Sequence, residues 1–154
     1  MENLSTKFVL HDGSSAPQRS RINDVGYDLT VLSVGRSSKA HESTQTFMID
    51  FGVCIEPPAG YYFELIPRSS LAWTGFIMPN SIGVIDPDYR GSLKMPLLYL
   101  GSPKNADIQA ASLIGRRLAQ LVLRPLLSTD FIEVQAHELS KTSRGKKGFG
   151  SSGL

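Results

Sequence analysis

The sequence predicts an all-β fold of the sandwich, jelly-roll or barrel kind. Short runs of β-branched, aromatic and other apolar residues recur along the chain, and clusters of Gly, Pro, Ser and Asp separate them. Only residues 70–73 look helical, and they form at most one turn. Residues 107–111 could form another turn but are assigned to a strand or loop. Strands this short and this regularly spaced are typical of closed or double-sheet β architectures.

Seven runs are predicted as strands, because each is apolar and ends at turn-forming residues. Gly13 and Pro17 follow the first run, and Pro57, Pro58 and Gly60 separate the third from the fourth. The predicted strands cover residues 8–10, 27–34, 46–55, 61–66, 93–100, 117–124 and 131–134.

The composition is that of a single globular domain. The chain has 154 residues, of which 41% are hydrophobic and 19% charged, and its net charge is +2. So low a charge gives no reason to expect nucleic acid as a required partner, and any electrostatic role must come from local clusters. Cys54 is the sole cysteine, which excludes an intramolecular disulfide, and the histidines show no metal-ligand spacing. We therefore expect no metal site made of protein side chains alone.

The chain shows no membrane or export signal. No segment reaches the length of a membrane span, and residues 1–7 lack the apolar centre of a signal peptide. We therefore expect no membrane partner and a cytoplasmic or nuclear location in a reducing compartment. From about Lys141 the composition shifts to Ser, Gly and Lys, which predicts a folded domain at residues 1–140 and a mobile arm at residues 141–154.

The most specific block is residues 79–91. A glycine, an apolar strand, an Asp-Pro-Asp turn and an aromatic strand predict a β-hairpin there. Asp86 and Asp88 are good turn formers, which alone would explain one of them. The block also presents the amide of Asn80, a carboxylate and the phenol of Tyr89 within a few residues, which a turn does not require. The hairpin is therefore a candidate site.

Three further blocks carry polar residues beside predicted strands. Arg68, Ser69 and Ser70 open the helical turn, where serine N-caps and a nearby arginine suit either a phosphate group or an ordinary capped turn. Residues 115–121 are equally consistent with a strand that has a basic start. Residues 25–29 contain one aspartate, which alone indicates nothing.

The last block, residues 144–153, is rich in glycine. Its four glycines permit backbone conformations in which successive N–H groups converge on an anion. Arg144 and two lysines add positive charge, two serines add hydroxyl donors, and Phe149 is the only large apolar residue. From these residues alone, two interpretations stay open: a frayed, solubilising end, or an arm that closes over an anionic ligand.

Together and in this order, the five blocks resemble the trimeric dUTPase family, the all-β deoxyuridine triphosphate nucleotidohydrolases. The resemblance spans residues 26–153, and its most specific parts are Gly-Val-Ile-Asp-x-Asp-Tyr-Arg-Gly at 83–91 and Arg-Gly-x-x-Gly-Phe-Gly-Ser-Ser-Gly at 144–153. It implies a distorted jelly-roll, β-clip-like barrel that forms a homotrimer with sites shared between subunits. It also implies hydrolysis of dUTP to dUMP and pyrophosphate, which limits uracil incorporation into DNA.

The resemblance implies roles for residues near the hairpin. Asp86 would orient and partly deprotonate the water that attacks the α-phosphorus, since phosphoryl transfer depends on positioning and charge neutralisation. Tyr89 would pack against the deoxyribose and leave no room for a 2′-hydroxyl. Asn80, helped by backbone groups such as that of Gly83, would pair with the polar edge of uracil. Lys94 is expected among the substrate-binding residues.

It likewise implies how phosphates and metal are held. Arg68, Ser69 and Ser70 would bind the phosphates, and Gln120 would contact them or the attacking water as a second catalytic residue. Asp28 matches an acidic position that touches Mg²⁺ only through its water shell. The Mg²⁺ cofactor would then be carried by the triphosphate.

In the arm, the resemblance implies a lid. The arm residues expected to bind substrate are Arg144, Gly148, Phe149, Gly150, Ser151 and Ser152. The arginine would reach the γ-phosphate, the phenylalanine would stack over uracil, and the serines would bond phosphate oxygens. Fixing each flexible residue costs about 1–2 kcal/mol, so charge-assisted contacts with the nucleotide would have to offset the ordering.

Several positions depart from the family pattern, namely Val25, Ser70, Arg116, Lys146 and Lys147. The largest departure is Arg116, where the block at 115–121 usually carries Asp or Glu. This reversal of charge either removes an ion pair or places another cation near the phosphates.

Two other functions are alternatives to dUTP hydrolysis for this sequence. The first is dCTP deaminase, which shares the fold and an Arg-Ser-Ser-Leu-Ala motif. Deamination needs a general acid–base group close to the pyrimidine ring, and in that family it is a glutamate soon after the hairpin. The comparable position here is Pro96, which cannot transfer a proton. The second is a non-catalytic jelly-roll binding protein, for which nucleotide would not order the arm.

Overall fold

Ten strands and three short helices form within residues 4–38 and 45–148, the parts of the chain that the computed structural model describes. The helices are η1 (Ser69–Trp73), η2 (Pro103–Asn105) and α1 (Ala106–Ala111). The strands are β1 (Lys7–Leu10), β2 (Tyr27–Thr30), β3 (Ser33–Arg36), β4 (Thr46–Asp50), β5 (Val53–Glu56), β6 (Tyr61–Pro67), β7 (Phe76–Ile77), β8 (Gly83–Ile85), β9 (Lys94–Tyr99) and β10 (Arg117–Pro125).

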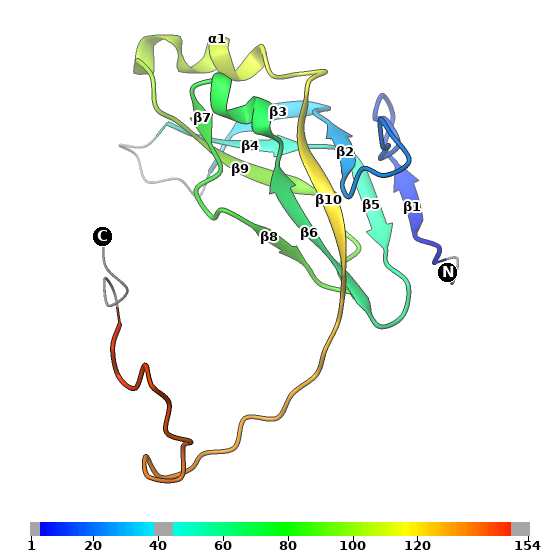
Figure 1. The fold of residues 1–154 in the computed structure, drawn as a ribbon. Coiled ribbons are helices and arrows are strands. Elements are labelled where there is room, and N and C mark those ends of the chain that lie inside the picture. Colours follow the sequence, from blue (N-terminus) through cyan, green and yellow to red (C-terminus); the bar gives the residue numbers. More distant parts are fainter. Residues whose placement is uncertain (1–3, 39–44, 149–154) are drawn as a thin grey trace.

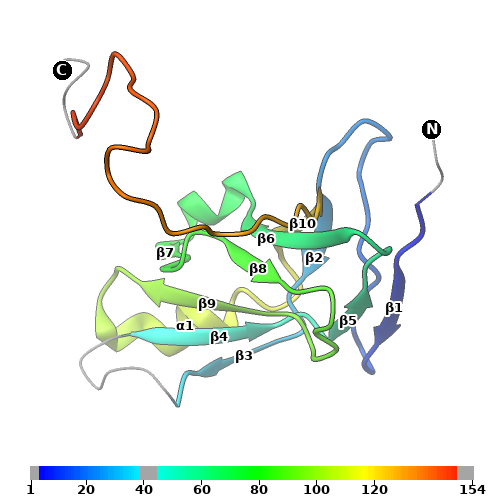
Figure 2. The ribbon, with the colours of Figure 1, turned by 90° about the horizontal axis from the view of Figure 1, so that it is seen from below.

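Two four-stranded antiparallel sheets lie one over the other as a sandwich (Figures 1 and 2). The first sheet has the order β2-β10-β6-β8 and the second has the order β3-β4-β9-β7. A two-stranded sheet of β1 and β5 lies beside them. The predicted all-β, jelly-roll type of fold is confirmed.

The core lies between the two sheets, because alternate side chains of each strand point inward. In β4, Phe47 and Ile49 are buried, and the same alternation buries Met95 and Leu97 in β9. Leu65 is fully buried in the facing sheet. Burying each such side chain contributes about 1.5–3 kcal/mol, so this layer of large apolar residues holds the sheets together.

The predicted strands at 27–34 and 46–55 each divide into two, because the chain crosses from one sheet to another. Between β4 and β5 the crossing occurs at Gly52, which has φ +65°. A Cβ there would overlap the Leu32 side chain, so only glycine fits this corner. Phe51 is fully buried beside it, and apolar residues therefore run through the corner without a break in the pattern.

Residues 107–111 were predicted as strand or loop, and this was wrong, because they belong to helix α1. Alanine has the highest helix propensity, and the buried Ala106 and Ala110 lie one turn apart on the face toward the core. Asp107 on the same helix binds Arg36 of β3 through two hydrogen bonds of 2.8 Å. None of the described helices is long and apolar enough to cross a membrane.

The hairpin predicted at 79–91 was only half correct. Its first strand, β8, forms but pairs with β6, with Ile85 opposite Phe63. The expected aromatic strand is instead a turn in which the Tyr89 N–H donates to the Asp86 carbonyl at 3.1 Å. The next strand begins only at β9.

The strand predicted at 131–134 was also wrong. The chain leaves the sheets after β10 and forms no further helix or strand up to residue 148 (Figure 1). Phe131 is 98% exposed, so this apolar run finds no strand to pair with inside the described chain.

The corner between β4 and β5 is held by the Asp50 carboxylate. It accepts hydrogen bonds from the Gly52 N–H at 2.8 Å and from the Ser92 hydroxyl, and it forms an ion pair with Lys94 at 3.4 Å. Partial burial raises the pKa of Asp50, but the bonds from Ser92 and Gly52 and the charge of Lys94 outweigh it, so the net pKa is lowered. A lowered pKa stabilises the fold above the unfolded value of 3.8, and this contribution is lost as the pH falls through the folded value.

Replacing this carboxylate should therefore weaken the fold most at neutral pH. Asp50→Asn should lower the free energy of unfolding at pH 7 by about 1–3 kcal/mol and reduce its decline below pH 4. Urea unfolding at several pH values measures both effects. Lys94→Gln, which removes only the exposed partner, should cost less than about 1 kcal/mol. An unchanged acid profile in Asp50→Asn would contradict this account of the corner.

Candidate functional site

A polar pocket of about 430 Å³ lies where β2, β10 and the end of β6 meet. We call it the arginine pocket, and its lining residues are Ser20, Arg21, Asp24, Val25, Gly26, Asp28, Arg68, Ser69 and Gln120. The register of the sheet places Gln120 of β10 opposite Asp28 of β2. The loop before β2 and the chain after β6 supply the other side chains.

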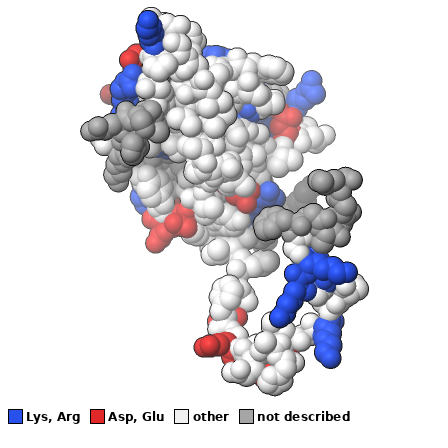
Figure 3. Space-filling view, turned by 90° about the vertical axis from the view of Figure 1, so that its left-hand side faces the viewer, with Lys and Arg blue, Asp and Glu red and all other residues white. Residues whose placement is uncertain are grey.

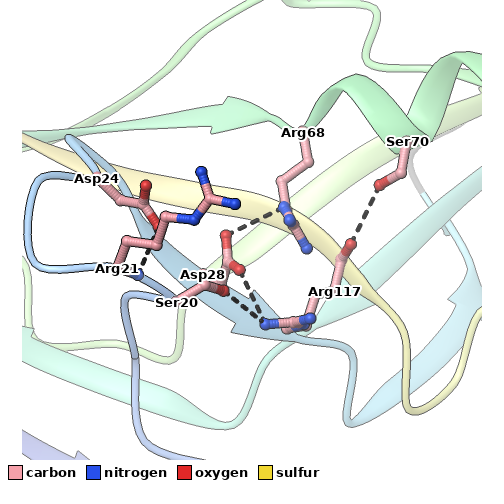
Figure 4. Close-up of polar contacts among 7 residues, drawn as sticks. All are labelled: Ser20, Arg21, Asp24, Asp28, Arg68, Ser70 and Arg117. Carbon is pink, nitrogen blue, oxygen red and sulfur yellow. Dashed lines mark hydrogen bonds and ion pairs between the residues drawn. The ribbon is translucent and has the colours of Figure 1, made fainter.

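The Asp28 carboxylate is the centre of the pocket, and the residue is only 7% exposed. Its Oδ1 pairs with Arg68 Nε at 3.0 Å and its Oδ2 with Arg117 Nη1 at 3.2 Å (Figure 4). The same Arg117 nitrogen donates to the Ser20 hydroxyl at 3.2 Å. A buried carboxylate is costly unless it is paired, so Asp28 fixes two guanidinium groups that come from different strands.

The chain after β6 places Arg68 and Ser69 at the pocket. The Arg68 N–H donates to the Leu118 carbonyl of β10 at 2.8 Å, so Arg68 is still extended and continues the sheet. The predicted serine N-cap was therefore wrong: Arg68 occupies the N-cap position of η1, and no side chain caps the helix. The Ser70 hydroxyl donates to the Arg117 carbonyl at 3.4 Å instead of lining the pocket.

The lack of a side chain at Gly26 leaves room for the side chain of Gln120. A Cβ on Gly26 would overlap Oε1 of Gln120, so any other residue would displace the amide. The amide lies over the buried backbone at Gly26 and lines the pocket from β10. This close approach explains why glycine stands in the block at 25–29.

Of the predicted site residues, four gather in the arginine pocket: Asp28, Arg68, Ser69 and Gln120. The others with a described position lie elsewhere, with Asn80, Gly83, Asp86 and Tyr89 between β7 and β9, Lys94 on the second sheet, and Arg144 and Gly148 beyond β10. Phe149, Gly150, Ser151 and Ser152 lie outside the described residues.

The turn after β8 presents Asp86 on a well-held backbone. Besides the bond from the Tyr89 N–H, Arg90 Nη1 donates to the Pro87 carbonyl at 2.7 Å. The Tyr89 hydroxyl donates to the Ser92 carbonyl at 3.0 Å, and its ring lies over Gly91, where a Cβ would overlap it. The Asp86 side chain is exposed and makes no hydrogen bond or ion pair with the described residues.

Asp86 and the arginine pocket lie at opposite ends of β6. Ile85 pairs with Phe63 near the start of that strand, and Arg68 follows its last residue. Five residues of extended chain at about 3.3 Å each put about 16 Å between these positions. One copy of the chain therefore does not bring Asp86 to the arginine pocket.

The described side chains of the pocket do not form a metal-binding group of their own, so a metal ion suits this pocket only as part of a bound ligand. Within residues 4–38 and 45–148, no group of three or more His, Cys, Asp or Glu side chains is placed to hold a metal ion. Each Asp28 oxygen already accepts an N–H from an arginine, and its remaining lone pairs can accept from water. This donor set suits contact with the water shell of a phosphate-bound Mg²⁺.

Two arginines were missed as site residues from the sequence: Arg21, which lines the pocket, and Arg117, which pairs with Asp28 beside it. Arg117 lies in the block at 115–121, but the sequence assigns it no role. Its role in holding the Asp28 carboxylate is seen only in the structure. Arg21 lies outside every block, and its only signal is a basic loop just before Gly26.

Fold and pocket together define a jelly-roll protein with a polar pocket that arginine side chains line. The dUTPase family model matches residues 12–153, and the chain belongs to the dUTPase family. A deoxyuridine 5'-triphosphate nucleotidohydrolase of Treponema pallidum is 33% identical over 154 residues, covering 98% of this chain and 99% of that protein. The protein of the same name from Escherichia phage T5 is 40% identical over 126 residues, covering 82% and 75%.

Solved structures agree with this family. The dUTPase of Staphylococcus bacteriophage 80alpha, solved with dUPNHPP, matches with a TM-score of 0.75 and 25% identity, covering 100% of both chains. The chain is thus a dUTP diphosphatase, which hydrolyses dUTP to dUMP and pyrophosphate.

The contact between Gly26 and Gln120 can be tested directly. Gly26→Ala should displace the amide and lower kcat/KM about 100-fold, since small misplacements at a reacting centre cost this much. Gly35→Ala is the control, because a Cβ there meets nothing within 4 Å, and it should stay within about twofold of the native value.

The double variant Gly26→Ala/Gln120→Gly should be no less active than Gln120→Gly alone, because glycine at 120 removes every Gln120 atom that the added Cβ would meet, its own Cβ at 3.0 Å included. Steady-state kinetics with dUTP measures this. Losses that multiply would show that Gly26 matters for another reason.

Proposed function

We propose that a water molecule oriented by Asp86 attacks the α-phosphorus of dUTP. The observation that carries this proposal is the exposed Asp86 carboxylate, which has no described partner and stands on a turn held by backbone hydrogen bonds. An ionised carboxylate can accept a proton from water as the new bond to phosphorus forms and pyrophosphate leaves. Its fixed position would keep the water in line with the leaving group.

The same turn and the residues before β8 are proposed to bind the nucleoside. Tyr89 would pack its half-exposed ring against the deoxyribose, where a 2′-hydroxyl would clash. Asn80 Nδ2 donates to the Ile82 carbonyl at 3.3 Å, which orients the amide and leaves its oxygen to accept from uracil. The backbone of Gly83 would complete the polar edge, and Lys94 is retained as a predicted substrate contact.

The arginine pocket is proposed to bind the triphosphate. Arg68 uses its Nε to hold Asp28, which leaves its terminal nitrogens for phosphate oxygens. Ser69 and Gln120 add neutral donors at the same pocket, with Ser70 nearby and Gln120 close enough to assist the attacking water. Mg²⁺ bound to the triphosphate neutralises phosphate charge, and Asp28 would accept hydrogen bonds from its water shell.

A homotrimer with shared sites is proposed from two observations. The separation of about 16 Å between Asp86 and the arginine pocket requires that they serve different sites or different copies. In addition, the segment after β10 exposes apolar side chains that a single chain leaves uncovered: Leu127, Phe131, Ile132 and Leu139 are 85%, 98%, 80% and 65% exposed. A neighbouring copy would cover them.

Residues 141–154 are proposed to close over the site as an arm. They hold four of the 16 basic residues and none of the acidic ones, which leaves 12 basic against 14 acidic residues elsewhere, a net charge of −2. Figure 3 shows basic side chains on the arm, beside a face of the body that is mostly uncharged. Positive charge for an anionic substrate is thus concentrated after the last described strand, with Arg144 and Gly148 exposed.

The alternatives fit the structure less well. Pro96, at the position a deaminase would need for its acid–base group, lies within β9 opposite Met48 of β4. A protein that only binds would not need the Asp86 carboxylate exposed on a rigid turn. A cytoplasmic or nuclear location is proposed on the ground that Cys54 is free.

Mixing two inactive variants tests the shared site. Asp86→Asn and Arg68→Gln should each lose most activity alone. Refolded together at equal amounts, they should recover about a quarter of the native activity, because random assembly gives a quarter of the sites both native residues. Arg68→Gln mixed with Gln120→Ala should recover none, since both residues line one pocket. No recovery in the first mixture would contradict sharing between copies.

Removing the arm tests its role as a lid. A chain ending at Lys141 should keep its unfolding midpoint, because every described residue after Arg124 is exposed. Its kcat/KM should fall by about 100-fold or more, since charge-assisted bonds are worth about 1.5–3 kcal/mol each. Thermal unfolding and steady-state kinetics measure the two properties. Native kinetics in the shortened chain would rule out the lid.

A further inference from the structure

Arg21 lines the arginine pocket but has no role in the function proposed above. It lies on the loop before β2, which is closed by a bridge between Gln18 and Asp28. In this bridge the Asp28 N–H donates to the Gln18 carbonyl at 2.7 Å and the Gln18 N–H donates back at 3.3 Å. The loop that carries Arg21 therefore ends at the same residue that fixes Arg68 and Arg117.

The backbone of Arg21 is held while its side chain is not. The Arg21 N–H donates to Asp24 Oδ2 at 2.8 Å, and the Asp24 N–H donates to the Arg21 carbonyl at 3.1 Å. The Asp24 carboxylate is thus engaged by the backbone. In the described part of the chain, the Arg21 guanidinium forms no hydrogen bond or ion pair, and it extends toward the side of the pocket where Arg68 lies (Figure 4).

Arg19, two residues earlier on the same loop, is placed differently. Its guanidinium lies over the Tyr27 ring at 4.7 Å, and its Nη1 donates to the Asp24 carbonyl at 3.4 Å. Arg19 does not line the arginine pocket. The loop therefore holds one arginine engaged with its own protein and one directed at the pocket.

The charges of the pocket also favour a role for Arg21 in binding an anion. Asp28 is shared by Arg68 and Arg117, so two cations already face one carboxylate. With Arg21, three arginines stand against the two carboxylates of Asp28 and Asp24, which leaves a net charge of +1 for an anion. A guanidinium with free donors, beside a second one with free terminal nitrogens, matches the spaced oxygens of a phosphate chain.

We propose that Arg21 is a further substrate-binding residue of this chain, which contacts the triphosphate of dUTP from the loop side of the arginine pocket. This inference rests on the phosphate-binding role proposed for the pocket. The loop before β2 would then contact the substrate, although Arg21 lies outside the five sequence blocks that resemble the family.

Arg21→Gln tests the contact against the matched control Arg19→Gln, which makes the same charge change on the same loop. Arg21→Gln should raise the KM for dUTP about tenfold and leave kcat within about twofold, because a charge-assisted contact to a bound anion is lost. Its inhibition constant for inorganic pyrophosphate should rise by a similar factor. Arg19→Gln should change neither, and Arg21→Lys, which keeps the charge, should recover part of the loss.

Arg68→Gln in the same assays distinguishes phosphate binding by the pocket as a whole from phosphate contact by Arg21. If Arg68→Gln weakens pyrophosphate inhibition while Arg21→Gln behaves like Arg19→Gln, the pocket binds phosphate and Arg21 does not, which overturns the inference. If neither Arg68→Gln nor Arg21→Gln changes it, the phosphate role of the pocket fails. Thermal unfolding of each variant excludes a folding defect, and Arg21→Met provides a second neutral replacement.

Discussion

The carboxylate of Asp28 is the charge on which the arrangement of the pocket depends. Its oxygens hold guanidinium groups from β10 and from the end of β6, and its backbone closes the loop that starts at Gln18. Breaking a buried pair costs about 3–5 kcal/mol, and less here because Arg68 and Arg117 are 30% and 42% exposed. A single residue on β2 therefore fixes four segments of the chain relative to one another.

The proposed site combines parts that are fixed by different means. Ion pairs set the arginine pocket, and backbone hydrogen bonds set the turn that carries Asp86, so neither has to be ordered when substrate binds. Residues 141–148 lie apart from both sheets and carry the concentrated positive charge. In the proposed function the fixed parts would supply geometry, and the arm would supply charge at the cost of ordering its residues.

Much of the fold follows from local sequence, because most strands are apolar runs with Gly or Pro close to their ends. The corners do not, since the alternation of buried apolar residues continues through Ile49, Phe51 and Val53 where the chain changes sheets. The run at 131–134 has strand-like composition but no partner strand in the same chain, and pairing is not a local property. In the pocket, Asp28 was found through its block. Arg117 and Arg21 were not, because their roles arise from side chains brought together by the sheet.

The strand order of the first sheet has a consequence for how this protein acquires its structure. β10 is the last strand to be synthesised, yet it lies between β2 and β6, which do not pair with each other. A nascent chain that stops short of Arg117 leaves two hydrogen-bonding edges open and its apolar face uncovered. The first sheet is therefore completed only when residues 117–125 are available, and until then its open strand edges are exposed to pairing with other chains.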